Sequence, residues 1–501
     1  MNIVNEISFY EKIKNLNKKI KISQTEEYYD TIVGVVDKVS LEATKTALKD
    51  ASEATIAYRY HKKCFFALTI LIDKTLYKFS DDIFVSKENL TKFIINYIIK
   101  SDIKLYVYNL KHFIKPLLNQ LNEDELKAFN KKVYDVQLLD YIINLNKNNH
   151  LFDEHNLYSK KVKTILGRVH KTQTAHYYIP RHILHKVMIF ESVFLYHYGT
   201  IFEKIHIKLE QEVLLKRLQL FSLVLSDIEK ENLVIDTNKF NDLIEEENIS
   251  NVFFKKILNY CNKFKTNLLP IRYKHNNSIT GRLTFNNEHK INMLSIPKNK
   301  TRELIIPENN TFLSMDINGM EVFYFIKNYT DILDKIEITS DFDIYKYIDK
   351  ELNLNEDRKI IKNTLIKLLY GATNFKAEEI IIKQVITENY PALDVKNRVD
   401  KKIPNYIQTK FKRIIHINKD YNKLLNNFIQ SESNDLMINN ITLLWYNLRK
   451  LKLKSKIKML IHDQIIIDCV EEEIGIIKTL LKKTIKNFPY STLESNTFYL
   501  N

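Results

Sequence analysis

A short β-rich run, Thr311–Ser314, leads through Met315 to an isolated acid, Asp316. Such a run is typical of a buried strand, and the apolar residues Val322–Ile326 indicate a buried helix or strand soon after it. An acid at the end of a buried strand aims its carboxylate at an open edge, beside a backbone carbonyl, here that of Ile317. Carboxylate and carbonyl oxygens are the ligands that a hard cation such as Mg²⁺ prefers. The sequence therefore predicts a cation site at this strand end.

A second candidate ligand, Asp463, lies far along the chain in the expected turn of a β-hairpin. The flanking runs, Ile457–Ile461 and Gln464–Val470, have the composition of strands, and Asp suits turns. Two acids on adjacent strands can hold two divalent ions about 4 Å apart, which clamp the attacking and leaving oxygens of a phosphoryl transfer. Asp316 and Asp463 are therefore the candidate catalytic and metal-binding acids.

An expected helix from about Asn355 to Tyr370 lies between these acids in the sequence. Arg358 and Lys362 are one turn apart on it, so both can face a triphosphate. Tyr370 lies two turns beyond Lys362, where its ring could stack near a base. Phosphoryl transfer depends on electrostatic positioning more than on covalent catalysis, so this helix would suit a nucleotide site.

Charge and composition limit the class of protein. The 501 residues carry 76 Lys and Arg against 61 Asp and Glu, a formal net charge of +15 that favours a polyanionic partner. Hydrophobic residues make up 45%, which is typical of a globular chain with two or more domains. Three scattered cysteines do not suit a disulfide framework or a zinc site. With no visible secretory leader or membrane span, we expect a reducing, cytoplasmic location in a bacterium, a phage-infected host or an organelle with an AT-rich genome.

The N-terminal part reads as an α/β unit, residues 51–200, after a polar and helical extension, residues 1–50. Expected strands and helices alternate along the unit: strands Thr55–Tyr60, Cys64–Asp73, Leu76–Phe79 and Lys104–Asn109, and helices Lys87–Lys100, Leu110–Leu121 and Tyr134–Leu145. Residues 155–190 are basic and His-rich, without Asp or Glu. Helices are expected over Ile201–Lys230, twice within Thr237–Leu269, around Tyr345–Leu352 and over Glu472–Lys486, and a loop over Tyr273–Asn287.

Four segments follow one another at a recognisable spacing: Ser278–Leu283, Asp316 with Glu321, Arg358 to Gly371, and Ile461–Asp463. Together they resemble the polymerase region of family A DNA polymerases, the bacterial DNA polymerase I group. The resemblance runs from about Leu218 to the C-terminus. It implies a right-hand polymerase domain, residues 201–501, with a reduced thumb at about 210–275, a palm at about 276–340 and 425–501, and fingers at about 341–424.

The resemblance also implies roles for single residues. DNA-binding roles fall on Thr280, Arg282, Asn426, Gln430 and His462, and nucleotide-binding roles on Glu321, Arg358, Lys362, Ile366 and Tyr370. Glu321 would block the space that a ribose 2′-hydroxyl needs in the nucleotide-binding pocket, and so favour deoxynucleotides. Asp316, Ile317 and Asp463 would hold two Mg²⁺ ions, for which Mn²⁺ can substitute.

Four positions depart from the family pattern. Gln464 stands where the family has a third acid, Ile366 where it has an aromatic residue, and Phe323 and Asn422 where it has arginines. The segment between Asp236 and Thr280 is also shorter than the family's thumb, which bears on the grip on duplex DNA. Both metal-binding acids remain.

The N-terminal unit resembles the family's 3′–5′ exonuclease domain, which has an RNase H-like fold. Its acidic positions fall here on Tyr58, Tyr60 and Phe113, and the last falls within the acid-free stretch 155–190. Asp135 alone is retained. A two-metal nuclease with one carboxylate cannot hold its ions, so we expect a vestigial domain, with no 5′-nuclease domain before it.

These observations predict a DNA polymerase without proofreading, acting on a primer–template duplex and deoxynucleoside triphosphates. A catalytically inert DNA-binding scaffold is the alternative from another class, and an RNA polymerase or reverse transcriptase is a third. No membrane partner is expected. The choice of a DNA or RNA template, a processivity partner, and a replicative or repair role are not written in the sequence.

Overall fold

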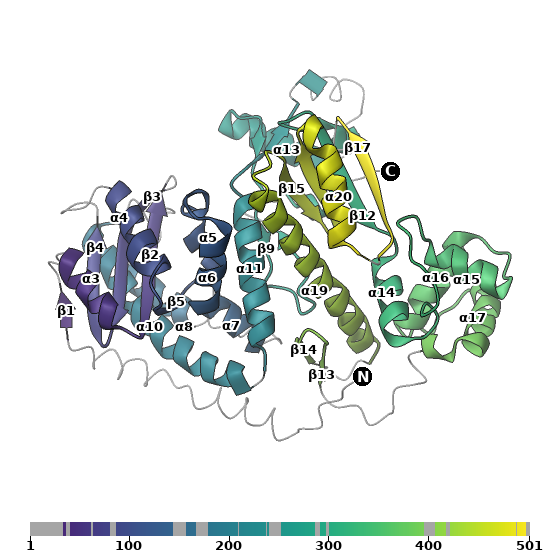
Figure 1. Cartoon of the computed structure of the whole chain (residues 1–501), viewed down its shortest axis with the longest axis horizontal. Coiled ribbons are helices and arrows are strands. Elements are labelled where there is room, and N and C mark those ends of the chain that lie inside the picture. The colour runs from purple at the N-terminus through teal and green to yellow at the C-terminus, as the bar shows by residue number, and fades with distance from the viewer. Residues whose placement is uncertain are drawn as a thin grey trace. The chain divides into compact units, whose positions relative to one another are not determined.

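The computed structural model describes residues 34–36, 41–61, 64–80, 87–143, 157–166, 179–208, 210–236, 238–239, 252–285, 291–296, 300–394, 406–416, 421–486 and 488–496. These residues belong to two compact units, and the chain passes from one to the other after Asp227 (Figure 1). The sequence assigned residues from 201 onward to the polymerase-like part, whereas the structure groups residues up to Asp227 with the N-terminal unit. The functional limits of the domains stay a prediction.

The N-terminal unit is built on a six-stranded mixed sheet in the order β1-β4-β3-β2-β5-β6. Its strands are β1 (Gly34–Val36), β2 (Glu53–His61), β3 (Cys64–Ile72), β4 (Thr75–Ser80), β5 (Lys104–Val107) and β6 (Val133–Asp135). The expected meander is confirmed, because β2, β3 and β4 pair antiparallel. β5 pairs parallel with β2, and β6 pairs parallel with β5. The central strand β3 is a continuous apolar run, which suits a strand that is covered on both faces.

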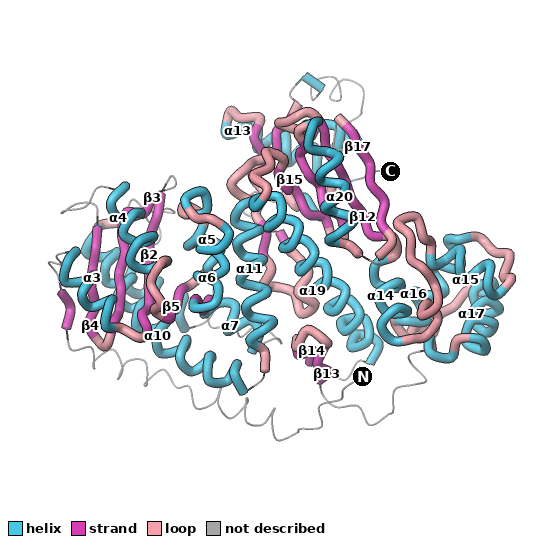
Figure 2. The backbone as a smooth tube through the Cα atoms, viewed as in Figure 1, coloured by secondary structure: helices cyan, strands magenta, loops and turns pink. Residues whose placement is uncertain are grey.

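Helices pack around this sheet (Figure 2). They are α3 (Leu41–Asp50), α4 (Lys87–Phe93) followed by the π-helix η1 (Ile94–Ile99), α5 (Leu110–Ile114), η2 (Leu118–Gln120), α6 (Glu123–Lys132), α7 (Val136–Ile143), α8 (Leu157–Leu166), α10 (Arg181–Lys208) and α11 (Glu212–Ile228). The long helix α10 contacts β2, β3, β5 and α7. The expected helix over Tyr134–Leu145 was wrong at its start, since Tyr134 pairs with Tyr106 of the sheet before α7 begins.

The C-terminal unit contains a four-stranded antiparallel sheet in the order β15-β16-β12-β17. Its strands are β12 (Thr311–Ile317), β15 (Lys456–Ile461), β16 (Gln464–Cys469) and β17 (Tyr490–Ser495). The predicted strand and hairpin are confirmed, but β17 was not predicted. The 30-residue helix α19 (Tyr421–Lys450) contacts β15 and α20 (Ile474–Thr484). The short helix η8 (Glu471–Glu473) comes directly before α20 in the sequence.

A helical part of the same unit follows β12. It comprises α14 (Met320–Tyr329), α15 (Ile344–Leu352), α16 (Arg358–Leu369), α17 (Ala377–Asn389) and η7 (Pro391–Leu393), and then the small hairpin β13 (Tyr406–Gln408) and β14 (Ile414–His416). Val322–Ile326 is therefore helical. One hydrophobic core joins α14 to α17 with the hairpin and the first turns of α19.

Smaller elements complete the unit. They are the three-stranded sheet β11-β7-β8 (Ile305–Ile306, Leu233–Ile235, Leu268–Leu269), the pair β9 (Tyr273–Lys274) and β10 (Thr284–Phe285), the helix α13 (Val252–Phe264), and the 3₁₀ helices η5 (Met293–Ser295) and η6 (Lys300–Leu304). The expected loop over Tyr273–Asn287 is thus a short hairpin in its described part.

Several expectations concern residues outside the described ranges. These are most of the N-terminal extension, one of the two short helices before Leu269, and residues 155–156 and 167–178 of the acid-free stretch. Within the described ranges, no helix has both the length and the apolar character needed to cross a membrane.

Candidate functional site

Asp316 and Asp463 lie at the same end of the C-terminal sheet. Asp316 is the penultimate residue of β12, and it lies opposite Gln464 of β16 and Ser491 of β17. His462 and Asp463 form the two-residue turn between β15 and β16, so Asp463 comes directly before Gln464. The turn is tight, and His462 in it has a positive φ of 53°. Strand pairing therefore brings together two acids that are far apart in the sequence.

Three segments of the unit converge electrostatically on Asp463. This side chain is half-buried, and burial raises the pKa of its carboxyl group above the ordinary value. A backbone hydrogen bond and the nearby His462, Arg282 and Lys362 act in the opposite direction and lower that pKa. Arg282 comes from the β9–β10 connection and Lys362 from α16. A desolvated carboxylate is a favourable ligand for a divalent ion, because the ion compensates the charge that burial makes costly.

The candidate donors at this end of the sheet, two carboxylates and a backbone carbonyl, are of the oxygen type that Mg²⁺ prefers. Across the described ranges, no group of three or more His, Cys, Asp or Glu side chains is placed to hold a metal ion. A cation here would depend on Asp316, Asp463 and the Ile317 carbonyl. Mg²⁺ commonly binds through one or two carboxylates and completes its shell with water and substrate phosphates, so two acids suffice.

Glu321 is shared by two donors in the first turn of α14. The Tyr370 hydroxyl donates to Glu321 Oε2, and Arg282 donates to Glu321 Oε1. Burial raises the pKa of Tyr370, whereas Arg282 and a hydrogen bond with Gln430 lower it. Four residues expected to bind nucleotide or DNA therefore form one cluster, which we call the Glu321 cluster: Arg282, Glu321, Tyr370 and Gln430.

The first turns of helix α16 carry exposed basic side chains. Asp357 caps its N-terminus, and both Arg358 and Lys362 are exposed. Arg358 Nε donates to Asp343 at 2.6 Å, and its guanidinium lies 5.0 Å from the centre of the Tyr345 ring. Exposed ion pairs of this kind contribute little stability, so a triphosphate could compete with Asp343 for Arg358.

The remaining residues expected to bind DNA are distributed over three segments. Thr280 is buried before Arg282, and its hydroxyl lies 2.9 Å from that of Ser278. Asn426 accepts a hydrogen bond from Gln430 one turn later on α19, and so lies next to the Glu321 cluster. His462 is exposed in the hairpin turn beside Asp463.

The departures from the family pattern have structural partners. Gln464 Nε2 donates to Ser314 Oγ at 2.6 Å. Phe323 is fully buried, with its ring 5.3 Å from that of Phe488 in an edge-to-face arrangement. Ile366 is half-buried against the same core. Phe323 and Ile366 therefore contribute to packing, and the side chain of Asn422 lies outside the described part.

Sequence reasoning missed two buried polar groups on α19. Asp435 is fully buried and forms an ion pair with the equally buried Arg413. Glu432 is also fully buried and accepts hydrogen bonds from the Tyr329 hydroxyl and, at 2.5 Å, from the Lys410 amide. Both acids stand in a run of polar residues, Gln430–Asp435, so the sequence carried no sign that they are buried and paired.

In the N-terminal unit, Asp135 is committed to the backbone. It is 2% exposed and accepts hydrogen bonds from the amides of Asn109 (3.2 Å), Leu110 (2.8 Å) and Gln137 (3.0 Å). Burial raises the pKa of its carboxyl group to about 6, although these amides lower it. Its oxygens thus stabilise the start of α5 and of α7.

Aromatic packing occupies two of the positions where the resemblance implies acids. The Tyr58 and Phe113 rings lie 5.1 Å apart, edge to face, and Phe113 is fully buried. The Tyr58 hydroxyl donates to the carbonyl oxygens of Tyr108 and Asn109. Tyr60 lies in β2, and its side chain is outside the described part.

Comparison with known proteins shows the fold. No protein-family model matches the chain, and a search of curated proteins finds no match. The chain is similar to the solved structure of the POL domain of Pol1 from M. smegmatis in complex with DNA primer–template and dNTP, with a TM-score of 0.70 and 12% identity. The similarity covers 93% of this chain and 99% of that one. The chain therefore shares the fold of a DNA polymerase domain.

Proposed function

We propose that this chain is a template-directed DNA polymerase that adds deoxynucleotides to the 3′ end of a primer. The observation that carries this proposal is the convergence of three segments on one half-buried carboxylate. Asp463 comes directly before Gln464, the strand partner of Asp316. Its carboxyl group interacts electrostatically with Arg282 and Lys362, which lower its pKa. Acids and cations that meet at a sheet end suit phosphoryl transfer, which requires positioned charge more than covalent catalysis.

Asp316, Asp463 and the Ile317 carbonyl would hold the divalent ions. Two bound Mg²⁺ ions, or Mn²⁺ in their place, would activate the primer 3′-hydroxyl and stabilise the leaving pyrophosphate. The raised pKa of Asp463 supports this role, since a desolvated carboxylate gains from a compensating cation.

The exposed face of α16 would receive the nucleotide. Lys362 and Arg358 would bind the triphosphate through charge-assisted hydrogen bonds, and Arg358 would exchange Asp343 for a phosphate oxygen. Tyr370 and Ile366 would lie near the base and the sugar. Glu321, held by the Tyr370 hydroxyl, would exclude a ribose 2′-hydroxyl.

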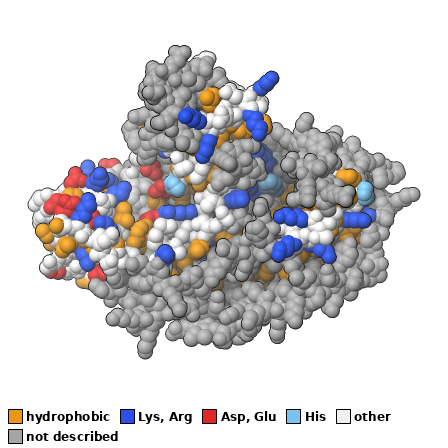
Figure 3. Space-filling view, turned by 180° about the vertical axis from the view of Figure 1, so that it is seen from behind, with side chains coloured by type: hydrophobic (Ala, Val, Ile, Leu, Met, Phe, Trp, Pro, Cys, Tyr) orange, Lys and Arg blue, Asp and Glu red, His pale blue; other side chains and the backbone are white. Residues whose placement is uncertain are grey.

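Primer–template DNA would approach from the β9–β10 connection and α19. Arg282, Thr280, Asn426, Gln430 and His462 are the proposed contacts. Figure 3 shows that acidic side chains (red) gather at one end of the view, while Lys and Arg (blue) predominate elsewhere on the described part of this face. Basic side chains suit phosphate contacts, which supply most of the affinity for DNA.

We assign the N-terminal unit to an exonuclease-type, RNase H-like domain without proofreading activity. The strand order β4-β3-β2-β5-β6, with three antiparallel strands followed by two parallel ones, supports the fold assignment. The packing of Tyr58 against Phe113 and the backbone bonds of Asp135 support the loss of activity. The thumb, palm and fingers would have the limits that the sequence predicts.

A catalytically inert DNA-binding scaffold is the second candidate. Gln464 favours it, because it places an amide bound to Ser314 where the resemblance implies a third acid. Under this alternative the C-terminal unit would bind primer–template DNA without extending it.

Primer extension tests the proposal. Purified protein, Mg²⁺ and labelled primer are combined with DNA or RNA templates and with deoxynucleotides or ribonucleotides. We expect template-directed extension with deoxynucleotides on DNA. DNA binding without extension under any condition would favour the scaffold, and efficient ribonucleotide use would favour an RNA polymerase.

A further inference from the structure

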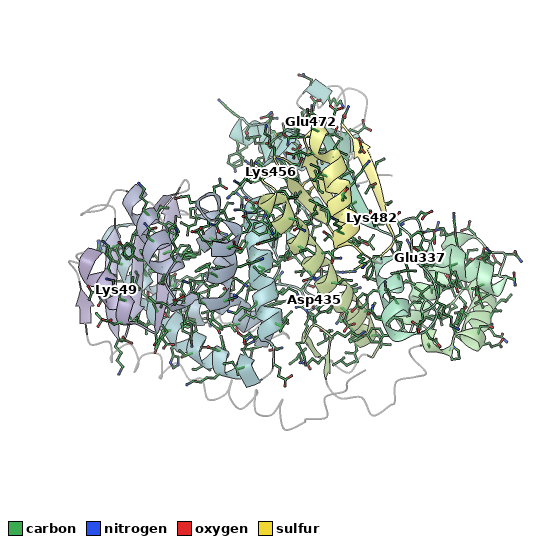
Figure 4. The ribbon with its side chains drawn as sticks, viewed as in Figure 1. Lys49, Glu337, Asp435, Lys456, Glu472 and Lys482 are labelled. Atoms are coloured by element: carbon green, nitrogen blue, oxygen red, sulfur yellow. The ribbon has the colours of Figure 1, made fainter. Side chains whose placement is uncertain are left out.

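Arg413 is the largest of the fully buried side chains in the described ranges, and it has no exposed surface. Its guanidinium makes a bidentate ion pair with Asp435 of α19, with Nε 2.9 Å from Oδ2 and Nη2 2.6 Å from Oδ1. Asp435 is labelled in Figure 4. Two desolvated charges are costly unless their geometry is good. Arg413 therefore cannot touch DNA or nucleotide directly.

The short connection before β14 fixes the backbone of Arg413. The Thr409 amide donates to the Arg413 carbonyl at 2.8 Å, and the Arg413 amide donates to the Thr409 hydroxyl at 3.0 Å. Lys412 between them has a positive φ of 67°. This closed turn directs the Arg413 side chain inward.

The guanidinium of Arg413 lies against Gly281. A Cβ at Gly281 would be 2.5 Å from Arg413 Nη2 and 2.8 Å from Cζ, and Gly281 has φ of +74°. Both the close approach and the backbone conformation require glycine. The Gly281 amide donates to the Ser278 carbonyl at 3.0 Å, so the guanidinium supports a tight turn of the β9–β10 connection.

The residue after this turn is Arg282, which donates to Glu321 and acts on the charge of Asp463. A change in the Gly281 backbone would therefore move a side chain that links the Glu321 cluster to the candidate metal site. Lys at position 413 would keep a positive charge. It would lose the planar group that both pairs with Asp435 and supports Gly281.

We propose that Arg413, locked by Asp435, is a positioning residue that sets the orientation of Arg282 through its contact with Gly281. This inference rests on the proposed polymerase function for its consequence in catalysis. The contact itself and the buried ion pair do not depend on that function.

A double-mutant cycle tests the proposal through activity. Arg413→Lys is expected to lower the primer-extension rate about tenfold in the wild-type background and less than about twofold in the Arg282→Ala background, because residues that act through one another are not additive. Gly281→Ala approaches the same contact from the other side, because its Cβ would displace Arg413 Nη2, so the same cycle is run with it in case Arg413→Lys fails to fold.

A matched control separates positioning from general destabilisation. Lys458 is 2% exposed and pairs with Glu308 at 2.8 Å, in the same unit. Lys458→Ala leaves a cavity in place of the buried stem and is therefore expected to lower the thermal midpoint, and its effect on the extension rate should be additive with Arg282→Ala. Equal losses from Arg413→Lys in both backgrounds would overturn the proposal.

Amide hydrogen exchange tests the contact without DNA or activity. Arg413→Lys is expected to raise exchange at Gly281 about tenfold, with the β15–β16 amides unchanged. Unchanged exchange at Gly281 would overturn the proposal even in an active enzyme. A protein that shows the exchange change but does not extend primers would instead contradict the proposed function alone.

Discussion

Asp316 lies directly opposite Gln464 across the β12–β16 pairing, and the Gln464 side chain donates a hydrogen bond to Ser314, two residues before Asp316 on the same strand. Residues i and i+2 of a strand share one face, and directly opposed residues do so as well. The position where the resemblance implies a third acid is therefore held by a neutral side chain on the face that carries Asp316.

Gln464→Glu should strengthen the binding of Mg²⁺ at the candidate site. The new carboxylate would add negative charge beside two acids, so the Mg²⁺ concentration for half-maximal extension should fall several-fold, by up to about tenfold, or ~1.4 kcal/mol. Metal titrations of the extension rate measure this, with Gln464→Ala as the variant that loses the Ser314 bond without gaining charge. A Glu variant that needs more Mg²⁺ than wild type would show that the charge is not near the metal site.

Lys362→Ala should separate a nucleotide ligand from a DNA contact. If Lys362 binds the triphosphate, this interaction becomes stronger as charge moves in the transition state. Its loss should then lower the rate at saturating nucleotide by about a hundredfold or more, with DNA affinity nearly unchanged. Lys359→Ala is the matched control, since Lys359 is an exposed lysine on the same helix.

The opposite role for Lys362 has its own signature. A contact to the DNA backbone would weaken DNA binding and reduce its salt slope by about one unit. Activity of Lys362→Ala that is restored simply by adding DNA would show that α16 holds the duplex, and the scaffold alternative would gain support.

Asp463 should make stability depend on pH in a defined direction. Burial raises the pKa of Asp463 in the folded state, so the folded state holds the proton more tightly than the unfolded state. The free energy of unfolding therefore falls as the pH rises from the unfolded pKa through the folded pKa. In metal-free buffer at pH 7, Asp463→Asn should therefore unfold at a higher temperature than wild type. The difference should shrink as the pH falls below the folded pKa, where both side chains are neutral. A lower midpoint for the variant throughout this range would contradict the assigned environment.

The N-terminal unit should not remove a mismatched primer end. Without nucleotides, Mg²⁺ and the purified protein should leave a 3′-mismatched primer at full length, because Asp135 is bound by backbone amides and Phe113 is buried against Tyr58. Gel analysis of the labelled primer measures this. Trimming that persists in Asp316→Asn would locate a nuclease site that the N-terminal unit was not expected to have.

Local patterns predicted the elements that carry the candidate site. The strand before Asp316, the hairpin around Asp463 and the α16 helix each have a clear periodicity or turn signal, and all three are confirmed at the level of secondary structure. Strand β17 was missed because its residues, Tyr490–Ser495, are half-exposed or exposed and form no apolar run. Its place beside β12 depends on pairing with a distant strand, which local propensity does not encode.

Side-chain relationships across long separations could not be predicted. The Arg413–Asp435 pair and the contact with Gly281 depend on how α19 and the β9–β10 connection meet in space. An arginine, an acid and a glycine are each common residues, and nothing in their spacing marks a buried contact. The departures at Phe323 and Ile366 were visible in the sequence, but their packing role required the core around α14 and α16.

The most direct test of the two-acid site is primer extension by Asp316→Asn and by Asp463→Asn, with the exposed acid Asp331 replaced in Asp331→Asn as the matched control. Each site variant should lower the extension rate by about a thousandfold or more, while DNA affinity changes by less than about threefold, since Lys and Arg contacts to phosphates supply most of it. The control should extend as wild type does. Near-normal extension by either site variant would contradict the assignment of these two acids.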